Sequence, residues 1–275
     1  MKRVLFVAAM LLLCSVISFS QTAKNNQTDT KGLKQGYWEE KVPNGTMKGH
    51  YEDDKKEGNW ITYSGNNNFL KLESYSGGMK QGIVIEVDQR GYLVGEMYYK
   101  DDLLDGTAKK FYYGTNPASV IDYRKGKIHG KKKVYYENAA GKLTEESDYT
   151  DDIKDGESKF YSANGDPIAE YVYRKGSLEG IQKSYYPGKK LMSEQNYVNN
   201  IESGLYKEYF ENGKLKMEGN YKDGKMEGKW VEYFENGVVK TNGSYINGEK
   251  EGKWIEYDEA GKVMSEARYS NGVKK

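Results

Sequence analysis

The sequence repeats itself with a period of 24 residues, and this repeat constrains the fold more than any other feature. A glycine recurs once in each unit, and its column comprises Gly36, Gly58, Gly82, Gly106, Gly130, Gly156, Gly180, Gly204, Gly228 and Gly252. A tyrosine column follows the same spacing and comprises Tyr51, Tyr75, Tyr99, Tyr123, Tyr149, Tyr173, Tyr197, Tyr221, Tyr245 and Tyr269. Both columns lengthen once by two residues, between Tyr123 and Tyr149, which indicates an insertion near Ala139. Such regularity predicts a tandem array in which each unit contacts mainly its neighbours.

A third column, three residues after each tyrosine, contains only Gly, Asp or Asn. Its members are Asp54, Gly78, Asp102, Gly126, Asp152, Gly176, Asn200, Gly224, Gly248 and Gly272. These residue types tolerate a positive φ, so the column predicts the tight turn of a β-hairpin. Its glycines, Gly78, Gly126, Gly176, Gly224, Gly248 and Gly272, are therefore expected to be structural turn positions. At the turn after Tyr221, we expect a positive φ at Gly224 and not at Asp223.

A second turn is expected in the other half of each unit, at pairs such as Asn212-Gly213 and Asn236-Gly237. Two turns per unit leave two short strands, of which residues 228–234 are an example. Alternate residues of a strand face opposite sides of the sheet, so Trp230 and Val231 would lie on different faces. Tyrosine is abundant, at 26 residues, whereas aliphatic positions are too few to bury two facing sheets. We therefore predict an all-β fold, a single-layer antiparallel meander of about ten tandem hairpin repeats forming an elongated, twisted sheet.

The segment Tyr221-Lys-Asp-Gly224-Lys-Met-Glu-Gly228-Lys-Trp230 resembles a MORN repeat, and it recurs from Tyr245 to Trp254. Tryptophan or tyrosine stands where the usual repeat has a further glycine, so the chain is most similar to the bacterial MORN-repeat variant family. The resemblance covers about residues 32–275. It implies a β-hairpin array. Members of this family are often labelled antitoxin-like components of toxin–antitoxin systems.

The first residues have the pattern of a secretory signal. Lys2 and Arg3 precede an apolar run that ends in Ser18-Phe19-Ser20, as in signal peptides. We therefore divide the chain into a signal peptide (1–20), a polar leader (21–33) and the repeat array (34–275). This division predicts an exported protein, located in the periplasm, at the cell surface or in the medium.

Composition excludes several classes of function. Lys+Arg is 42 and Asp+Glu is 41, which gives a formal net charge of +1 and no general attraction to nucleic acid. Cys14 is the single cysteine, and His50 and His129 are the two histidines. Disulfide frameworks and cysteine-based metal sites are therefore excluded, and neither histidine has partners at a spacing suited to metal binding. We expect no enzyme activity, no catalytic residues, no cofactor and no metal.

The tryptophans occupy one column, two residues after the repeat glycine. The candidate binding face consists of Trp38, Trp60, Tyr206, Trp230 and Trp254. One interpretation is that these aromatic residues shield the ends of the array, and the other is that they form platforms for a sugar or a peptide. A Glu column and a Lys column in alternate strands are interpreted as a solvated face that keeps the sheet soluble and in register.

These observations favour a non-enzymatic exported scaffold that binds another protein, and the family resemblance implies an antitoxin-like or immunity-like form of that binding. A broad tyrosine-rich sheet face would make the contact, because tyrosine supplies rigid amphipathic area. The alternative is an envelope-associated module that binds lipid headgroups or cell-wall glycan through the aromatic sheet face.

Overall fold

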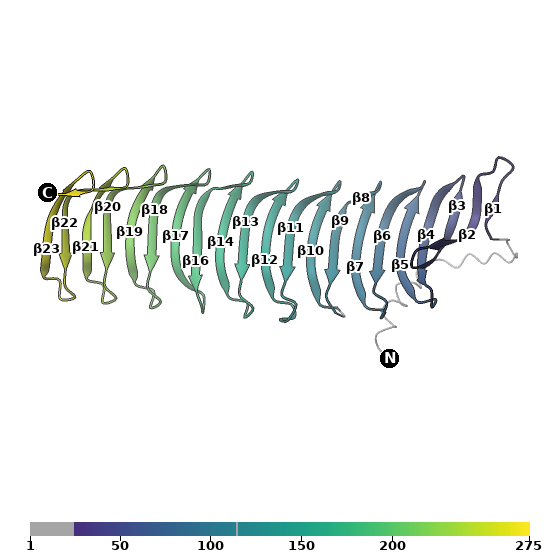
Figure 1. The fold of residues 1–275 in the computed structure, drawn as a ribbon, viewed down its shortest axis with the longest axis horizontal. Coiled ribbons are helices and arrows are strands. Elements are labelled where there is room, and N and C mark those ends of the chain that lie inside the picture. The colour runs from purple at the N-terminus through teal and green to yellow at the C-terminus, as the bar shows by residue number, and fades with distance from the viewer. Residues whose placement is uncertain (1–24, 114) are drawn as a thin grey trace.

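A computed structural model describes residues 25–113 and 115–275; the predicted signal peptide lies outside the described residues. The described chain forms 24 strands in one open antiparallel sheet. Neighbours in sequence are neighbours in the sheet, so the strands progress from β1 at one end to β23 at the other (Figure 1). The predicted all-β, single-layer meander is thus confirmed. Within the described residues, no helix has the length and apolarity needed to cross a bilayer.

Each unit contributes two strands. The first strands are β2 (Lys34–Val42), β4 (Lys55–Ser64), β6 (Met79–Val87), β8 and β9 (Leu103–Leu104, Gly106–Phe111), β11 (Lys127–Tyr135), β13 (Ile153–Tyr161), β15 and β16 (Ser177–Leu178, Gly180–Tyr186), β18 (Ile201–Tyr209), β20 (Lys225–Tyr233) and β22 (Glu249–Tyr257). The second strands are β3 (Gly45–Glu52), β5 (Phe69–Ser76), β7 (Leu93–Lys100), β10 (Pro117–Arg124), β12 (Leu143–Thr150), β14 (Pro167–Arg174), β17 (Lys190–Val198), β19 (Leu215–Lys222), β21 (Val239–Ile246) and β23 (Val263–Ser270). The short strands β1 (Gln27–Thr28) and β24 (Val273–Lys274) lie at the two edges.

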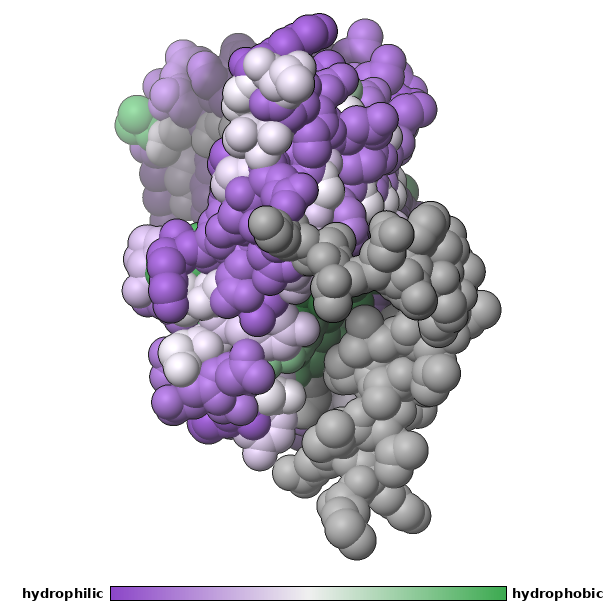
Figure 2. Space-filling model, turned by 90° about the vertical axis from the view of Figure 1, so that its right-hand side faces the viewer, coloured by the Kyte–Doolittle hydropathy of each residue, from purple (hydrophilic) through white to green (hydrophobic). Residues whose placement is uncertain are grey.

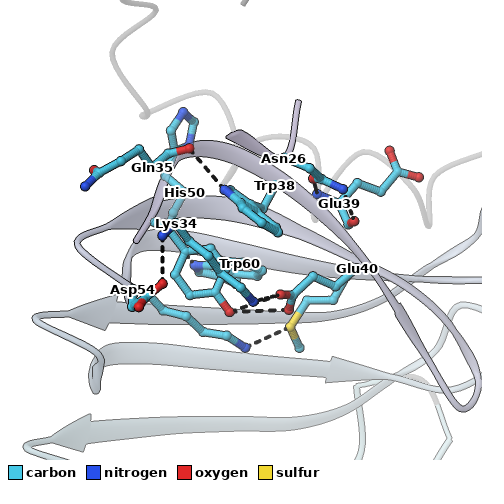
Figure 3. Close-up of polar contacts among 12 residues, drawn as sticks. Asn26, Lys34, Gln35, Trp38, Glu39, Glu40, His50, Asp54 and Trp60 are labelled. Carbon is cyan, nitrogen blue, oxygen red and sulfur yellow. Dashed lines mark hydrogen bonds and ion pairs between the residues drawn. The ribbon is translucent and has the colours of Figure 1, made fainter. Parts of the chain in front are cut away.

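The segment expected to be a polar leader belongs in part to the sheet, because β1 pairs with β2. Beside this pair, the Asn26 side-chain amide makes the two hydrogen bonds with the Glu39 backbone that a neighbouring strand would otherwise make. Its Nδ2 donates to the carbonyl of Glu39, and its Oδ1 accepts from the Glu39 N–H at 2.8 Å (Figure 3). An exposed strand edge offers unpaired backbone groups to other chains, so Asn26 and β1 close part of this edge.

The repeat glycines form bulges in the first strands, which the residue pattern did not predict. In β20, Glu227 pairs with Asn220 and Val231 pairs with Glu218. Gly228 and the next two residues therefore stand opposite Gly219 alone, which is a β-bulge. All ten repeat glycines have a positive φ, from +67° at Gly58 to +119° at Gly156. The strands are consequently longer than predicted, since in eight units the first strand continues through its glycine, while at Gly106 and Gly180 the strand is interrupted one residue before it.

The turns after the tyrosine column have two left-handed residues, as in a type I′ turn. Asp223 has φ +51° and Gly224 has φ +75°. The expectation of a positive φ at Gly224 alone was therefore wrong, because a two-residue hairpin loop of this type needs both residues in the left-handed region. The other five turn glycines, Gly78, Gly126, Gly176, Gly248 and Gly272, have φ between +76° and +89°.

Successive tight turns are hydrogen-bonded to one another. In every one of the ten turns, the second left-handed residue donates its N–H to a carbonyl at the start of the preceding unit, as Gly224 does to Glu202 at 2.9 Å. Where this residue is Asp or Asn, its side chain adds a bond. The N–H of Lys80, for example, donates to Oδ1 of Asp102 at 2.7 Å. The Gly, Asp and Asn column thus links units as well as forming turns.

The sheet has two distinct faces. The aromatic face carries the tyrosine column and the tryptophan column, because Gly228 pairs with Tyr245 and Trp230 pairs with Gly243. The opposite face, named the ladder face, carries the alternating Lys and Glu columns. Seen from the β1 end, the described surface is mostly hydrophilic (Figure 2). The largest buried side chains, Trp60 among them, belong to the aromatic face.

Candidate functional site

The structure places the predicted binding residues in two separate groups on the aromatic face. Trp38 and Trp60 contact Tyr51 near the N-terminal end of the array. Tyr206, Trp230 and Trp254 lie near the C-terminal end, where Tyr221 and Tyr245 stand between them. The rings of Tyr206 and Trp230 are stacked, with centroids 5.9 Å apart. The central strands, which carry polar residues such as Ser158 and Gln182 in this column, separate the two groups.

Three of the four indole rings are buried. Trp60 is 0% exposed, Trp230 4% and Trp254 7%. Each ring lies over a glycine of the preceding strand, and a Cβ atom at Gly49, Gly219 or Gly243 would overlap that ring. An aromatic side chain over a strand glycine replaces the packing that the glycine lacks.

Two of the three buried indole N–H groups satisfy carbonyls next to the bulge, whereas that of Trp230 has no hydrogen-bond partner among the described residues. Nε1 of Trp60 donates to the carbonyl of His50 at 3.0 Å, and that of Trp254 donates to Ser244 at 3.2 Å. Gln182 has the same role in a central unit, because its amide exchanges hydrogen bonds with the backbone of Val172. Trp38, at the first unit, donates to the carbonyl of Gln35 (Figure 3).

Lysines cover the outer side of the aromatic residues. Nζ of Lys56 lies 4.4 Å from the Trp60 ring centroid, and Nζ of Lys250 lies 4.1 Å from that of Trp254. Such contacts contribute about 0.5–1 kcal/mol at exposed sites and more where they are desolvated. Burial, an indole hydrogen bond and a covering lysine give Trp60 and Trp254 a structural role, and burial with stacking on Tyr206 gives one to Trp230. This favours the interpretation that the tryptophans shield the array ends over that of open platforms.

The ladder face presents a continuous row of alternating charges. The charge ladder consists of eight residues on successive strands, Lys133, Glu146, Lys159, Glu170, Lys183, Glu194, Lys207 and Glu218. Each residue is the direct cross-strand partner of the next, and opposite charges in this position stabilise a strand pair by about 0.2–1 kcal/mol. The two columns seen in the sequence are therefore one row in space.

The ladder glutamates are held by tyrosine hydroxyls from the same face. The Tyr209 hydroxyl donates to Oε1 of Glu194 at 2.9 Å, and the Tyr233 hydroxyl donates to Oε1 of Glu218 at 3.0 Å. Within the described residues, Lys183 and Lys207 take part in no ion pair or hydrogen bond through their ammonium groups, although Lys133 pairs with Glu146 at 3.6 Å. Two positive charges of the central ladder thus remain available.

A second row, in which the polar Asn196 of β17 separates exposed apolar side chains, runs beside the central ladder. Val172, Ile181 and Leu205 are 37%, 51% and 45% exposed, and each lies two residues from a ladder position on its own strand. A hollow of about 290 Å³ opens here and is lined by residues that include Val172, Ile181, Glu170 and Lys183. The ladder face therefore combines exposed apolar side chains with unpaired ammonium groups.

Neither histidine has the surroundings of a metal site. Nδ1 of His129 lies 3.2 Å from Oδ1 of Asp151 at a tight turn, where other units have an acidic residue that accepts a turn N–H, as Glu227 does from Asn247. His50 stacks edge-on against Tyr37. In the part of the chain that the structure describes, no group of three or more potential ligands could hold a metal ion.

The raised pKa values of the partly buried tyrosines should make the stability of the fold depend on pH in the alkaline range. Burial and the Glu170 carboxylate raise the pKa of Tyr185 to about 12, and burial and Glu194 raise that of Tyr209 to about 12. An unfolded tyrosine titrates near pH 10, so the fold favours the neutral phenol. This stabilisation is complete below about pH 10 and is lost as the pH rises through about 12.

Tyrosinate absorbance and far-ultraviolet circular dichroism, recorded together, should therefore show a group of tyrosines that ionises only as the sheet unfolds. The Tyr209→Phe variant should lose one late-titrating group. Complete ionisation near pH 10 with an intact sheet would contradict this assignment.

Comparison with known proteins identifies the repeat unit. A family model described as "MORN repeat variant" matches residues 154–175, 178–199, 202–223, 226–247 and 250–271. No curated protein matches the chain. Among solved structures, a chain in the crystal structure of TcdB2-TccC3-Cdc42 is 11% identical, covers 90% of this chain with a TM-score of 0.15, and is itself covered over 13% of its length. Five tandem repeats that match this variant model therefore follow one another between residues 154 and 271.

Proposed function

We propose that this protein is a non-enzymatic, exported scaffold that binds another protein through the centre of its ladder face. The observation that carries the proposal is the combination of unpaired Lys183 and Lys207 with the exposed side chains of Ile181 and Leu205. Protein interfaces combine an apolar centre with polar groups that determine orientation. An antitoxin-like or immunity-like role, which the family resemblance implies, would be one form of this binding.

The aromatic face is less suited to a partner. Its indole rings are buried and their N–H groups at Trp60 and Trp254 are already bonded. Binding of glycan or lipid headgroups there would require the covering lysines to move. We therefore place the partner on the ladder face and treat envelope binding as an outcome of the test.

The test is crosslinking of the tagged protein in its own host, with the double variant Lys183→Glu/Lys207→Glu beside the wild type. The matched control is Lys125→Glu/Lys175→Glu, which changes the charge equally at exposed tight turns. We expect one protein to be crosslinked by the wild type and the control, and lost with the ladder variant. A partner retained by the ladder variant, or sedimentation of the protein with envelope lipid or glycan alone, would refute the proposal.

A further inference from the structure

We infer that the partner segment recognised by the ladder face is an amphipathic α-helix that lies along the array and carries acidic residues at seven-residue spacing. This inference rests on the proposed protein-binding function and specifies the chemistry of the partner. The evidence is the spacing and charge of two neighbouring rows on strands β14, β16, β17 and β18.

The two available lysines have a defined spacing along the array. Lys183 on β16 and Lys207 on β18 are separated by one intervening strand, β17, which carries Glu194. Because neighbouring strands are about 4.8 Å apart, the two lysine positions are about 10 Å apart. Residues seven apart on an α-helix are separated by about 10.5 Å along its axis. Two acidic residues at this spacing therefore match the two lysines.

Ile181 and Leu205 flank the polar Asn196 in the row beside the ladder. Ile181 and Leu205 lie on the same two strands as the lysines, two residues nearer the tight turns. Two residues along a strand span about 6.7 Å, so both rows fall within the width of one helix, about 10 Å. Apolar side chains three positions after each acidic residue would then face Ile181 and Leu205. The hollow beside Val172 and Ile181 offers room for one of them.

The alternating charges of the ladder determine which partner charges fit. Glu194 lies between the two lysines, but its carboxylate accepts from the Tyr209 hydroxyl. Glu170 and Glu194 alternate with the lysines. An acidic residue of the partner that was shifted by one strand along the array would face one of these glutamates and be repelled. The ladder therefore selects both the sign and the spacing of the partner's charges, as complementary interfaces do. An extended strand is a poorer match, because the neighbouring strands offer it no free backbone groups on this face.

The test uses a synthetic helical peptide with glutamate at every seventh position and leucine three positions after each glutamate, on an alanine and glutamine background. One control peptide has the same composition in a scrambled order that preserves helicity, and a second has lysine in place of glutamate. Binding of the fluorescently labelled peptides to the full-length protein is measured by anisotropy. Chemical-shift changes of Ile181 and Leu205 report the location.

We expect the designed peptide to bind more tightly than either control by at least about tenfold, with weaker binding at high salt. Lys183→Glu/Lys207→Glu should abolish this preference, and Lys125→Glu/Lys175→Glu should retain it. Equal binding of the designed and scrambled peptides would overturn the helix inference. If crosslinking captures a partner that the ladder variant loses while the designed peptide binds no better than its controls, the helix inference fails and the proposed function stands. If crosslinking captures no partner that depends on Lys183 and Lys207, the proposed function itself fails.

Discussion

Replacing Trp230 by alanine is expected to lower the free energy of unfolding by about 3–5 kcal/mol, the range for buried large aromatic residues. The indole is 4% exposed, stacks on Tyr206 and covers Gly219. Gly219→Ala should also destabilise, by about 1–3 kcal/mol, because its Cβ overlaps the indole and overpacking of a filled site has this cost.

The decisive measurement is the double-mutant cycle. In the Trp230→Ala background the overlap no longer exists, so Gly219→Ala should become nearly neutral, with a coupling energy of about 0.5–3 kcal/mol. Chemical unfolding followed by far-ultraviolet circular dichroism gives the four values. Gly95→Ala is the matched control, because its Cβ would overlap no ring and would come no nearer than 3.4 Å to the Met97 Cε and 3.5 Å to the Glu86 Oε2. Equal costs of Gly219→Ala in the two backgrounds would disprove the pairing.

Removing one complete unit should leave a folded protein, whereas removing half a unit should not. Deletion of residues 178–201 joins Ser177 to Glu202, so β15 continues into β18 with the bulge, the faces and the ladder in register. Lys207 would then stand opposite Glu170, as Lys183 does now. The loss should be limited to one unit and its interfaces, as expected for a linear repeat array.

Deletion of residues 178–189 instead joins Ser177, at the tight-turn end, to Lys190, at the opposite end of β17. The missing strand spans about 25 Å, so β17 cannot occupy its place. We expect residues 190–275 to detach from the array, with strong loss of β signal and rapid proteolysis after Ser177. Similar spectra and protease resistance for the two deletions would show that the 24-residue unit is wrongly defined.

The sequence predicted the repeat, the strand order and the turn column, because the residue types at these positions report backbone conformation directly. It did not reveal that the repeat glycines are bulges. A glycine column indicates a positive φ but does not distinguish a turn from a bulge, and that distinction depends on how many residues the facing strand supplies. The prediction for Asp223 failed for a related reason, since aspartate also tolerates the left-handed region.

The burial of the tryptophans followed from the same bulge, and a sequence signal for it exists. Trp60, Trp230 and Trp254 each follow a glycine by eleven residues, whereas the central units, which lack tryptophan, have larger residues there, such as Glu73 and Tyr171. A tryptophan in one column together with a glycine eleven residues earlier therefore predicts that the indole ring lies over that glycine. The lack of an ion pair at Lys183 and Lys207, by contrast, depends on side-chain conformations that the residue pattern does not specify.

The hydrogen bonds between successive tight turns have a mechanical consequence. All ten turns are connected by backbone bonds of 2.7–3.2 Å, while at the opposite margin neighbouring units are linked by side chains, such as the hydroxyl of Tyr186 on the carbonyl of Tyr209. Stretching the array would therefore meet more resistance along one margin than along the other. Under load the strands should separate more at the loop margin than at the tight-turn margin, whose length should stay nearly constant. The array would therefore bend in one preferred direction.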